Sequence, residues 1–255
     1  MPALARADLE TLLRARKLDR TLTTALPPPS ETGPHDSLAV SATDVAPLDA
    51  RLGGGLPRGQ LSELVGPRSS GRTSLMLRML AAATARGELV ALVDVLDGFD
   101  VESAQAAGID LDRLLWIRGH VVVNPGFCRD LNQRALEQAV KALTLVLQAG
   151  NFGLVVFDAA DAPSDAIRRL PFTTWLRLQR MAEGSPTACV LIGAQPVARS
   201  SAGLTLALGV RPSTGSGRFS PRLFEGLDVD ARVVQARHRS QQQIDVRVPL
   251  STSCA

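Results

Sequence analysis

The feature of this sequence that most restricts its fold is a short glycine-rich segment near residue 70. Residues 66–73 read G-P-R-S-S-G-R-T; they follow the apolar run Leu61–Val65 and lead into Thr73–Arg86, which has helical character. This is the strand–loop–helix setting of the pattern G-x-x-x-x-G-K-[ST], in which backbone N–H groups and a helix N-terminus surround a phosphate. The segment therefore predicts an α/β domain that carries a phosphate loop.

The rest of the chain up to Gln195 alternates between apolar runs and amphipathic segments, which predicts a mostly parallel sheet flanked by helices. The expected buried strands are Leu61–Val65, Leu89–Asp94, Leu114–Ile117, Leu154–Asp158 and Ala188–Gly193, and the later helices are Leu131–Gln148 and Phe172–Glu183. After Gln195 no helix is expected. We predict that Leu204–Val210, Ala231–Ala236 and Ile244–Val248 add antiparallel strands at the sheet edge.

Outside this core, residues 44–195, we expect two appendages. Residues 1–26 form a predicted amphipathic helix with Leu9, Leu12 and Leu13 in its apolar stripe, followed by a proline-containing linker over 27–43. Such a stripe needs a partner surface, so a homo-oligomer is one expectation. Residues 196–255 form a basic β extension with eight bases and four acids, which holds the whole excess of the net charge of +3.

The basic extension suits an acidic protein or nucleic acid. Arg222, Leu223 and Phe224 are the candidate protein anchors there, because an apolar pair beside an arginine is typical of interfaces. DNA contact would be weak and non-specific, since no aromatic residues lie among the later arginines. Trp175 is a further interface candidate, near Arg168, Arg169, Arg177 and Arg180, although packing on a helix with one buried face and one solvated basic face is the simpler interpretation.

Composition excludes several classes of protein. No apolar stretch is long enough for a transmembrane helix, and the N-terminus lacks the apolar region of a secretory signal. Three widely spaced cysteines and three dispersed histidines indicate neither a disulfide framework nor a metal site. We therefore expect a cytoplasmic protein without a membrane partner.

The candidate nucleotide site departs from the phosphate-loop pattern at its charged position. It consists of Gly66, Ser69, Ser70, Gly71, Arg72, Thr73 and Asp158. Arg72 replaces the lysine that lies beside the β- and γ-phosphates, and the two side chains are not interchangeable there. Asp158 ends a strand and is the candidate Mg²⁺ partner, although a turn-forming aspartate is the simpler alternative. ATP and Mg²⁺ are expected to bind weakly or not at all.

The segment Leu48–Leu75 resembles the core of RecA recombinase, and the likeness extends to about residue 195. Asp100 and Gln195 match the RecA pattern. Three positions do not, because the phosphate-loop lysine is Arg72, the catalytic glutamate is Leu96, and the aromatic residue that stacks on adenine is Ser103. The resemblance therefore implies a RecA-like fold whose ATP-dependent machinery is altered, and no catalytic residue is assigned.

Together with the N-terminal helix and the basic β extension, these departures resemble the ImuA family of the bacterial translesion mutasome. Membership would imply a non-catalytic adaptor under SOS control that contacts ImuB, an inactive Y-family polymerase homologue. RecA is a further implied partner, and an error-prone DnaE-type polymerase an indirect one. Two alternatives remain open: an active RecA-like DNA-dependent ATPase, and a regulatory interaction protein unrelated to DNA.

Overall fold

The structure is a computed structural model that describes residues 40–120, 129–198, 203–210, 226–236 and 245–251. All of these lie in one compact unit, Asp36–Ala255. The predicted N-terminal helix with Leu9, Leu12 and Leu13 lies outside the described residues, and so do Arg222, Leu223 and Phe224. Among the described helices, none has the length and apolar character needed to cross a membrane.

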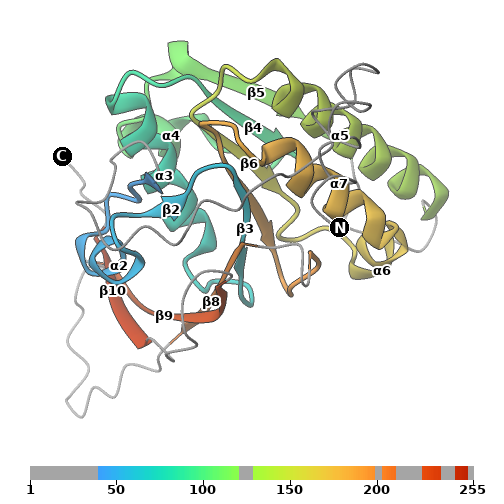
Figure 1. Ribbon diagram of the computed structural model, residues 1–255. Helices are drawn as coiled ribbons and strands as arrows, with labels where there is room; N and C mark the ends of the chain where they lie inside the picture. The colour runs from blue at the N-terminus through green and yellow to red at the C-terminus, as the bar shows by residue number, and fades with distance from the viewer. Residues whose placement is uncertain (1–39, 121–128, 199–202, 211–225, 237–244, 252–255) are drawn as a thin grey trace, which may run out of the picture. The chain divides into compact units, whose positions relative to one another are not determined.

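An eight-stranded sheet forms the centre of this unit (Figure 1). Its strands are β3 (Gln60–Val65), β4 (Val90–Asp94), β5 (Leu114–Arg118), β6 (Leu154–Asp158), β7 (Ala188–Gly193), β8 (Leu204–Val210), β9 (Gly226–Ala236) and β10 (Asp245–Ser251). The order across the sheet is β10-β9-β8-β3-β7-β6-β4-β5. Strands β3 to β8 are parallel to their neighbours among themselves, which confirms the predicted mostly parallel architecture.

One expectation about the sheet is wrong. Strand β8 pairs with β3 in parallel, and among the described strands of this sheet only β9 and β10 are antiparallel additions. The prediction assumed that a parallel return needs a helix, yet ten residues of extended chain can span about 33 Å, longer than a six-residue strand. The returning segment is held by Glu63, whose Oε1 accepts the N–H groups of Val197 and Ala198 at 2.7 and 2.8 Å.

Helices cover both faces of the sheet. α2 (Ala46–Leu52), α3 (Arg72–Ala85) and α4 (Val101–Ala106) contribute to one hydrophobic core. α5 (Arg129–Ala149), α6 (Ser164–Arg169) and α7 (Phe172–Ala182) contribute to the other, and Figure 1 shows these three together on one side. The sequence predicted α3, α5 and α7 but not the short α2, α4 and α6, which contain too few turns for a clear period.

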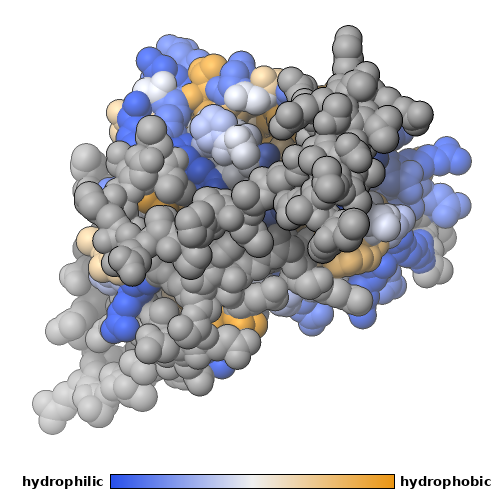
Figure 2. All heavy atoms as spheres, in the orientation of Figure 1, coloured by the Kyte–Doolittle hydropathy of each residue, from blue (hydrophilic) through white to orange (hydrophobic). Residues whose placement is uncertain are grey.

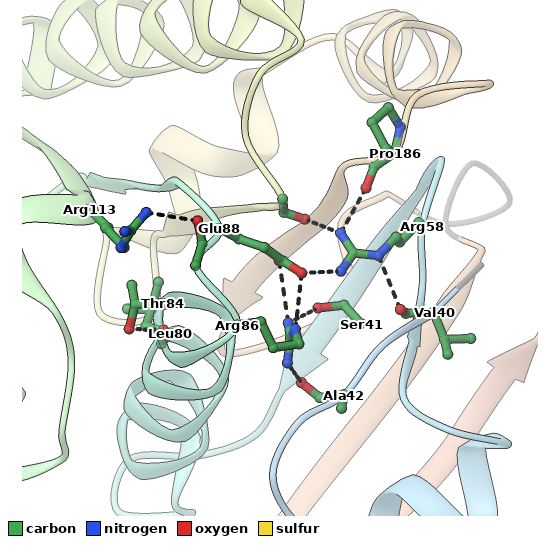
Figure 3. Close-up of polar contacts among 12 residues, drawn as sticks. Val40, Ser41, Ala42, Arg58, Leu80, Thr84, Arg86, Glu88, Arg113 and Pro186 are labelled. Atoms are coloured by element: carbon green, nitrogen blue, oxygen red, sulfur yellow. Dashed lines mark hydrogen bonds and ion pairs between the residues drawn. The ribbon is translucent and has the colours of Figure 1, made fainter. Parts of the chain in front are cut away.

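The first described residues lie near the amino ends of the sheet strands, whereas the phosphate loop follows the carboxyl end of β3. β1 (Val40–Ser41) pairs with β2 (Leu56–Pro57), and Arg58 binds the carbonyl of Val40 and the carboxylate of Glu88 (Figure 3). Arg86 donates to the Ser41 hydroxyl and to Glu88. The last residues of the expected linker, 40–43, are thus part of the folded unit, because the guanidinium groups of Arg58 and Arg86 bind Val40 and Ser41 there.

Candidate nucleotide site

The phosphate loop leaves β3 at Gly66 and enters α3 at Arg72. Ser69 and Gly71 have φ angles of +60° and +88°, so both lie in the left-handed region that a loop of this kind requires. A Cβ at Gly66 would lie 2.6 Å from the carbonyl oxygen of Leu208, so only glycine fits there. The loop therefore has the compact course that the sequence predicted.

Two hydroxyl side chains of this loop differ in their surroundings. Ser70 is buried, and within the described part of the chain its Oγ has no hydrogen-bond partner. Thr73 is exposed in the first turn of α3. A buried hydroxyl without a partner costs free energy unless a ligand or water satisfies it. Ser70 is thus the loop residue whose environment best fits a bound polar group.

Arg72 does not extend into solvent from the helix N-terminus. Its side chain is only 6% exposed, and its guanidinium reaches the turn after β6. Nη1 donates to the carbonyl oxygen of Ala160 at 3.1 Å, and Nη2 lies 3.4 Å from Asp161 Oδ1. Arg68, which is exposed, also lies 3.6 Å from that carboxylate. The charge that replaces the loop lysine is therefore already engaged by the protein.

Two aspartates lie side by side at the carboxyl ends of two adjacent strands. Asp94 of β4 and Asp158 of β6 are register partners. Burial of the Asp158 carboxyl raises its pKa to about 6, and the nearby charge of Asp94 adds to this rise. The backbone N–H of Ala160 and the charge of Arg72 oppose it. Asp158 Oδ1 accepts that N–H at 3.0 Å, so Asp158 is a turn-forming residue as well as a site carboxylate.

Asp94 is held by an aromatic cluster that the sequence reasoning missed. Its Oδ2 accepts the backbone N–H of Phe99 at 2.8 Å and the indole N–H of Trp116 at 3.3 Å. The two rings lie 5.3 Å apart, and the guanidinium of Arg118 lies 4.8 Å from the centre of the Trp116 ring. Arg118 in turn binds both oxygens of Asp97 at 2.7 Å. Trp116 lies two positions after the start of β5, and nothing in the sequence around it indicated that it would bind Asp94.

The residues that match or depart from the RecA pattern have ordinary structural roles here. Leu96 replaces the catalytic glutamate of RecA, so this position has no polar group that could activate water. Its side chain packs against the hydrophobic core on the α5–α7 side. Asp100 caps α4 by accepting the backbone N–H of Ser103 at 2.9 Å. Gln195 is exposed after β7. The structure thus brings together the phosphate loop, Asp94 and Asp158, and adds Ala160 and Asp161, which the sequence reasoning did not select.

The interface interpretation of Trp175 is wrong. Its side chain is 3% exposed and lies edge-on to Phe157 with 6.5 Å between ring centres. α7 has its apolar side against the sheet, and Trp175 belongs to that side because of its helical position relative to Leu178 and Ala182. It is a packing residue, and the neighbouring Arg168, Arg169, Arg177 and Arg180 lie at the surface.

Comparison with known proteins bears on this geometry. The RecA N-terminal domain family matches residues 31–167, which is more than half of the chain. The chain belongs to this family. Two curated RecA proteins are similar: that of Clavibacter michiganensis subsp. michiganensis is 38% identical over 126 residues, and that of Desulfotalea psychrophila is 32% identical over 128 residues.

The extent of this similarity is limited. The matches cover 49% and 50% of this chain but only 31% and 32% of those RecA proteins, so the chain spans about a third of the relatives it matches. The crystal structure of the RadB recombinase superposes with a TM-score of 0.60 at 20% identity, over 84% of this chain and 97% of that one. At this identity, the superposition shows the RecA-like fold alone.

Proposed function

We propose that this chain is a RecA-fold adaptor that does not hydrolyse ATP and that acts in SOS-induced, error-prone translesion DNA synthesis. Its proposed partners are ImuB, a catalytically inactive Y-family polymerase homologue, and RecA. The observation that supports this proposal most is the position of Arg72, whose guanidinium is buried and bound to Ala160 and Asp161. The resemblance to the ImuA family supplies the pathway and the partners.

Arg72 acts in this arrangement as an internal cation. Asp158 and Asp161 would otherwise place negative charge beside the loop, where Mg²⁺ would supply the compensating positive charge in a phosphate-loop protein that holds a nucleotide. To contact a phosphate instead, Arg72 would have to give up charge-assisted hydrogen bonds, each worth about 1.5–3 kcal/mol. That loss corresponds to roughly a tenfold to hundredfold weaker affinity for ATP.

Hydrolysis faces a second obstacle at Leu96. A RecA-like enzyme needs a polar group near the attacking water, and this side chain packs instead into the apolar core. The proposal therefore separates the two losses: Arg72 weakens nucleotide binding, and Leu96 removes the group that would activate water. A loop whose positive charge is already bound by Ala160 and Asp161 suits a protein whose function is to hold partners.

A second candidate function is an active RecA-like DNA-dependent ATPase. The loop keeps the glycines and left-handed residues of a phosphate loop, and Asp94 and Asp158 keep their place at the ends of adjacent strands. These features support residual nucleotide binding. They do not supply the missing water-activating group, which is why we favour the adaptor.

The test uses the full chain and purified ImuB. Size-exclusion chromatography should show a complex whose formation is unchanged by ATP and Mg²⁺, and phosphate release with single-stranded DNA should stay at background. Arg72→Lys should leave the complex intact, since we place this residue away from the partner surface. The adaptor proposal is wrong if no complex forms, or if the chain releases phosphate from ATP in a DNA-dependent reaction that Asp158→Asn abolishes.

A further inference from the structure

The outer surface of α6 and α7 is a basic face, which we define by Arg168, Arg169, Phe172, Arg177 and Arg180. All four arginines are exposed, and Phe172 is 40% exposed. Between Ser164 and Ala182 the only acidic residue is Asp165. Figure 2 shows hydrophobic surface beside hydrophilic residues near the place of α6 in Figure 1. The face thus combines an apolar side chain with an excess of positive charge.

Most of this charge is not used within the fold. Arg168 binds the Ser164 hydroxyl at 2.9 Å and lies 3.8 Å from Asp165. Arg169, Arg177 and Arg180 form no hydrogen bond or ion pair with any residue that the structure describes. Arginine with an exposed aromatic residue is the composition favoured at protein interfaces. One aromatic residue alone does not provide the series of stacking platforms typical of single-strand binding.

The same chain carries a complementary acidic face on α4 and the 3₁₀ turn Leu111–Arg113. Residues 97–112 contain five acids and no base: Asp97, Asp100, Glu102, Asp110 and Asp112, all of them exposed. Arg118 and Arg113 partly neutralise Asp97 and Asp110. Val101, which is 38% exposed, gives this face an apolar side chain as well.

These two faces cannot meet within one folded unit. α4 packs through Ala104 into the core on one side of the sheet, and α7 packs through Trp175 into the core on the other side. A contact between the faces therefore joins two copies of the chain. Because it uses different surfaces on the two copies, it is head-to-tail and leaves one face of each kind free at the ends.

We propose that the basic face docks the acidic face of a second copy of this chain, with Arg177 and Arg180 opposite Glu102 and Asp112. The positive charge is arginine throughout, so each guanidinium can bind a carboxylate in a bidentate manner. Phe172 and Val101 are the exposed apolar side chains beside these charges. The contact does not involve the nucleotide site, and it does not depend on the proposed function.

Charge reversal of the full chain tests this pairing by sedimentation velocity at low and high salt. R177E/R180E and E102K/D112K should each weaken self-association on the order of tenfold or more, because like charges then face one another. The variant with all four changes should restore it, since the charges are exchanged. A mixture of the two double variants should form a complex that neither forms alone.

R134E/K141E is the matched control, because it reverses two exposed basic side chains on α5, outside the basic face. It should leave association unchanged, and circular dichroism should show that every variant is folded. The proposal is overturned if the wild-type chain stays monomeric at low salt, or if R177E/R180E associates as the wild type does. Failure of the fourfold variant to recover association also overturns it, because the two faces then do not bind each other.

Discussion

Arg72 and Asp161 form an ion pair between the phosphate loop and the turn after β6, with 3.4 Å between Nη2 and Oδ1. The pair joins two segments that would surround the phosphates of a nucleotide. A shorter side chain with a single ammonium group cannot bridge the same two acceptors, Ala160 and Asp161, with a planar fork. The identity of residue 72 therefore decides whether this part of the site is closed by the protein or open to a ligand.

The first prediction follows from this pair. Arg72→Lys should raise the affinity for ATP with Mg²⁺ at least about tenfold, because the charge is freed for a phosphate oxygen. Calorimetry on both proteins measures the change. R72K should still release no phosphate, whereas R72K/L96E should give slow, measurable turnover. Submicromolar ATP binding by the wild-type chain would contradict the internal-cation interpretation.

A second prediction concerns Asp158, whose pKa in the folded chain is about 6 against an ordinary value of 3.8. Between these values the folded chain holds more protons than the unfolded chain, so the free energy of unfolding falls as pH rises from about 4 to 7. The loss from this group is on the order of 3 kcal/mol. Asp158→Asn removes the titrating carboxyl and therefore this pH-dependent loss of unfolding free energy.

Urea unfolding of the wild type and D158N at pH 4.5 and 7.5 measures this effect, since other titrating groups cancel in the comparison. D158N should gain stability relative to the wild type at pH 7.5, and the difference should shrink at pH 4.5. An unchanged difference across this range would mean that the Asp158 carboxyl does not titrate there.

The third prediction compares two aromatic residues of α7. Trp175→Ala should cost about 3–5 kcal/mol of unfolding free energy, because it leaves a cavity beside Phe157 in the core. Phe172→Ala should cost less than about 1 kcal/mol, because its side chain is 40% exposed. Equal costs from chemical denaturation would show that α7 is rotated relative to the sheet.

The sequence predicted the central sheet well, because strands β4, β6 and β7 are buried on both faces and appear as nearly continuous apolar runs. It could not predict the direction of β8, because a parallel return held by the carboxylate of Glu63 leaves no periodic pattern. Helices of six or seven residues were missed because they contain too few turns to show a periodic pattern of apolar residues.

The candidate site was predicted only in part. The phosphate loop has a local pattern, so its residues were found. The ion pair of Arg72 joins positions 89 residues apart, and the bond from Trp116 to Asp94 joins positions 22 apart. Such contacts depend on which strands are neighbours, and a single sequence does not state that. The same limit allowed Trp175 to be considered for the surface, because its burial depends on the orientation of α7.

The fourth prediction concerns the N-terminal helix, which we expect to support self-association. Removing this helix should lower the number of chains per particle that light scattering measures, provided that the shortened chain begins at Asp36. A chain that begins at Ser41 would lose Val40, which pairs with Pro57 and binds Arg58. An unchanged number of chains per particle after removal of residues 1–35 would rule out this helix as the source of association. R177E/R180E in the shortened chain then tests whether the basic face supplies the remaining association.

The fifth prediction concerns Arg222, Leu223 and Phe224, which we expect to bind the protein partner. Deleting residues 211–255 is a poor test, because β9 pairs with β8 over Leu204–Val210 and its loss would expose that edge of the sheet. Point variants leave the strands in place. L223A/F224A should weaken binding to ImuB on the order of a hundredfold, since two apolar anchors are removed, and R222E should chiefly slow association. Surface plasmon resonance separates these two effects, and fluorescence anisotropy with a labelled single-stranded oligonucleotide measures DNA binding of the same proteins. If the variants lose DNA affinity and keep their affinity for ImuB, the segment binds nucleic acid and the preference for a protein partner is wrong.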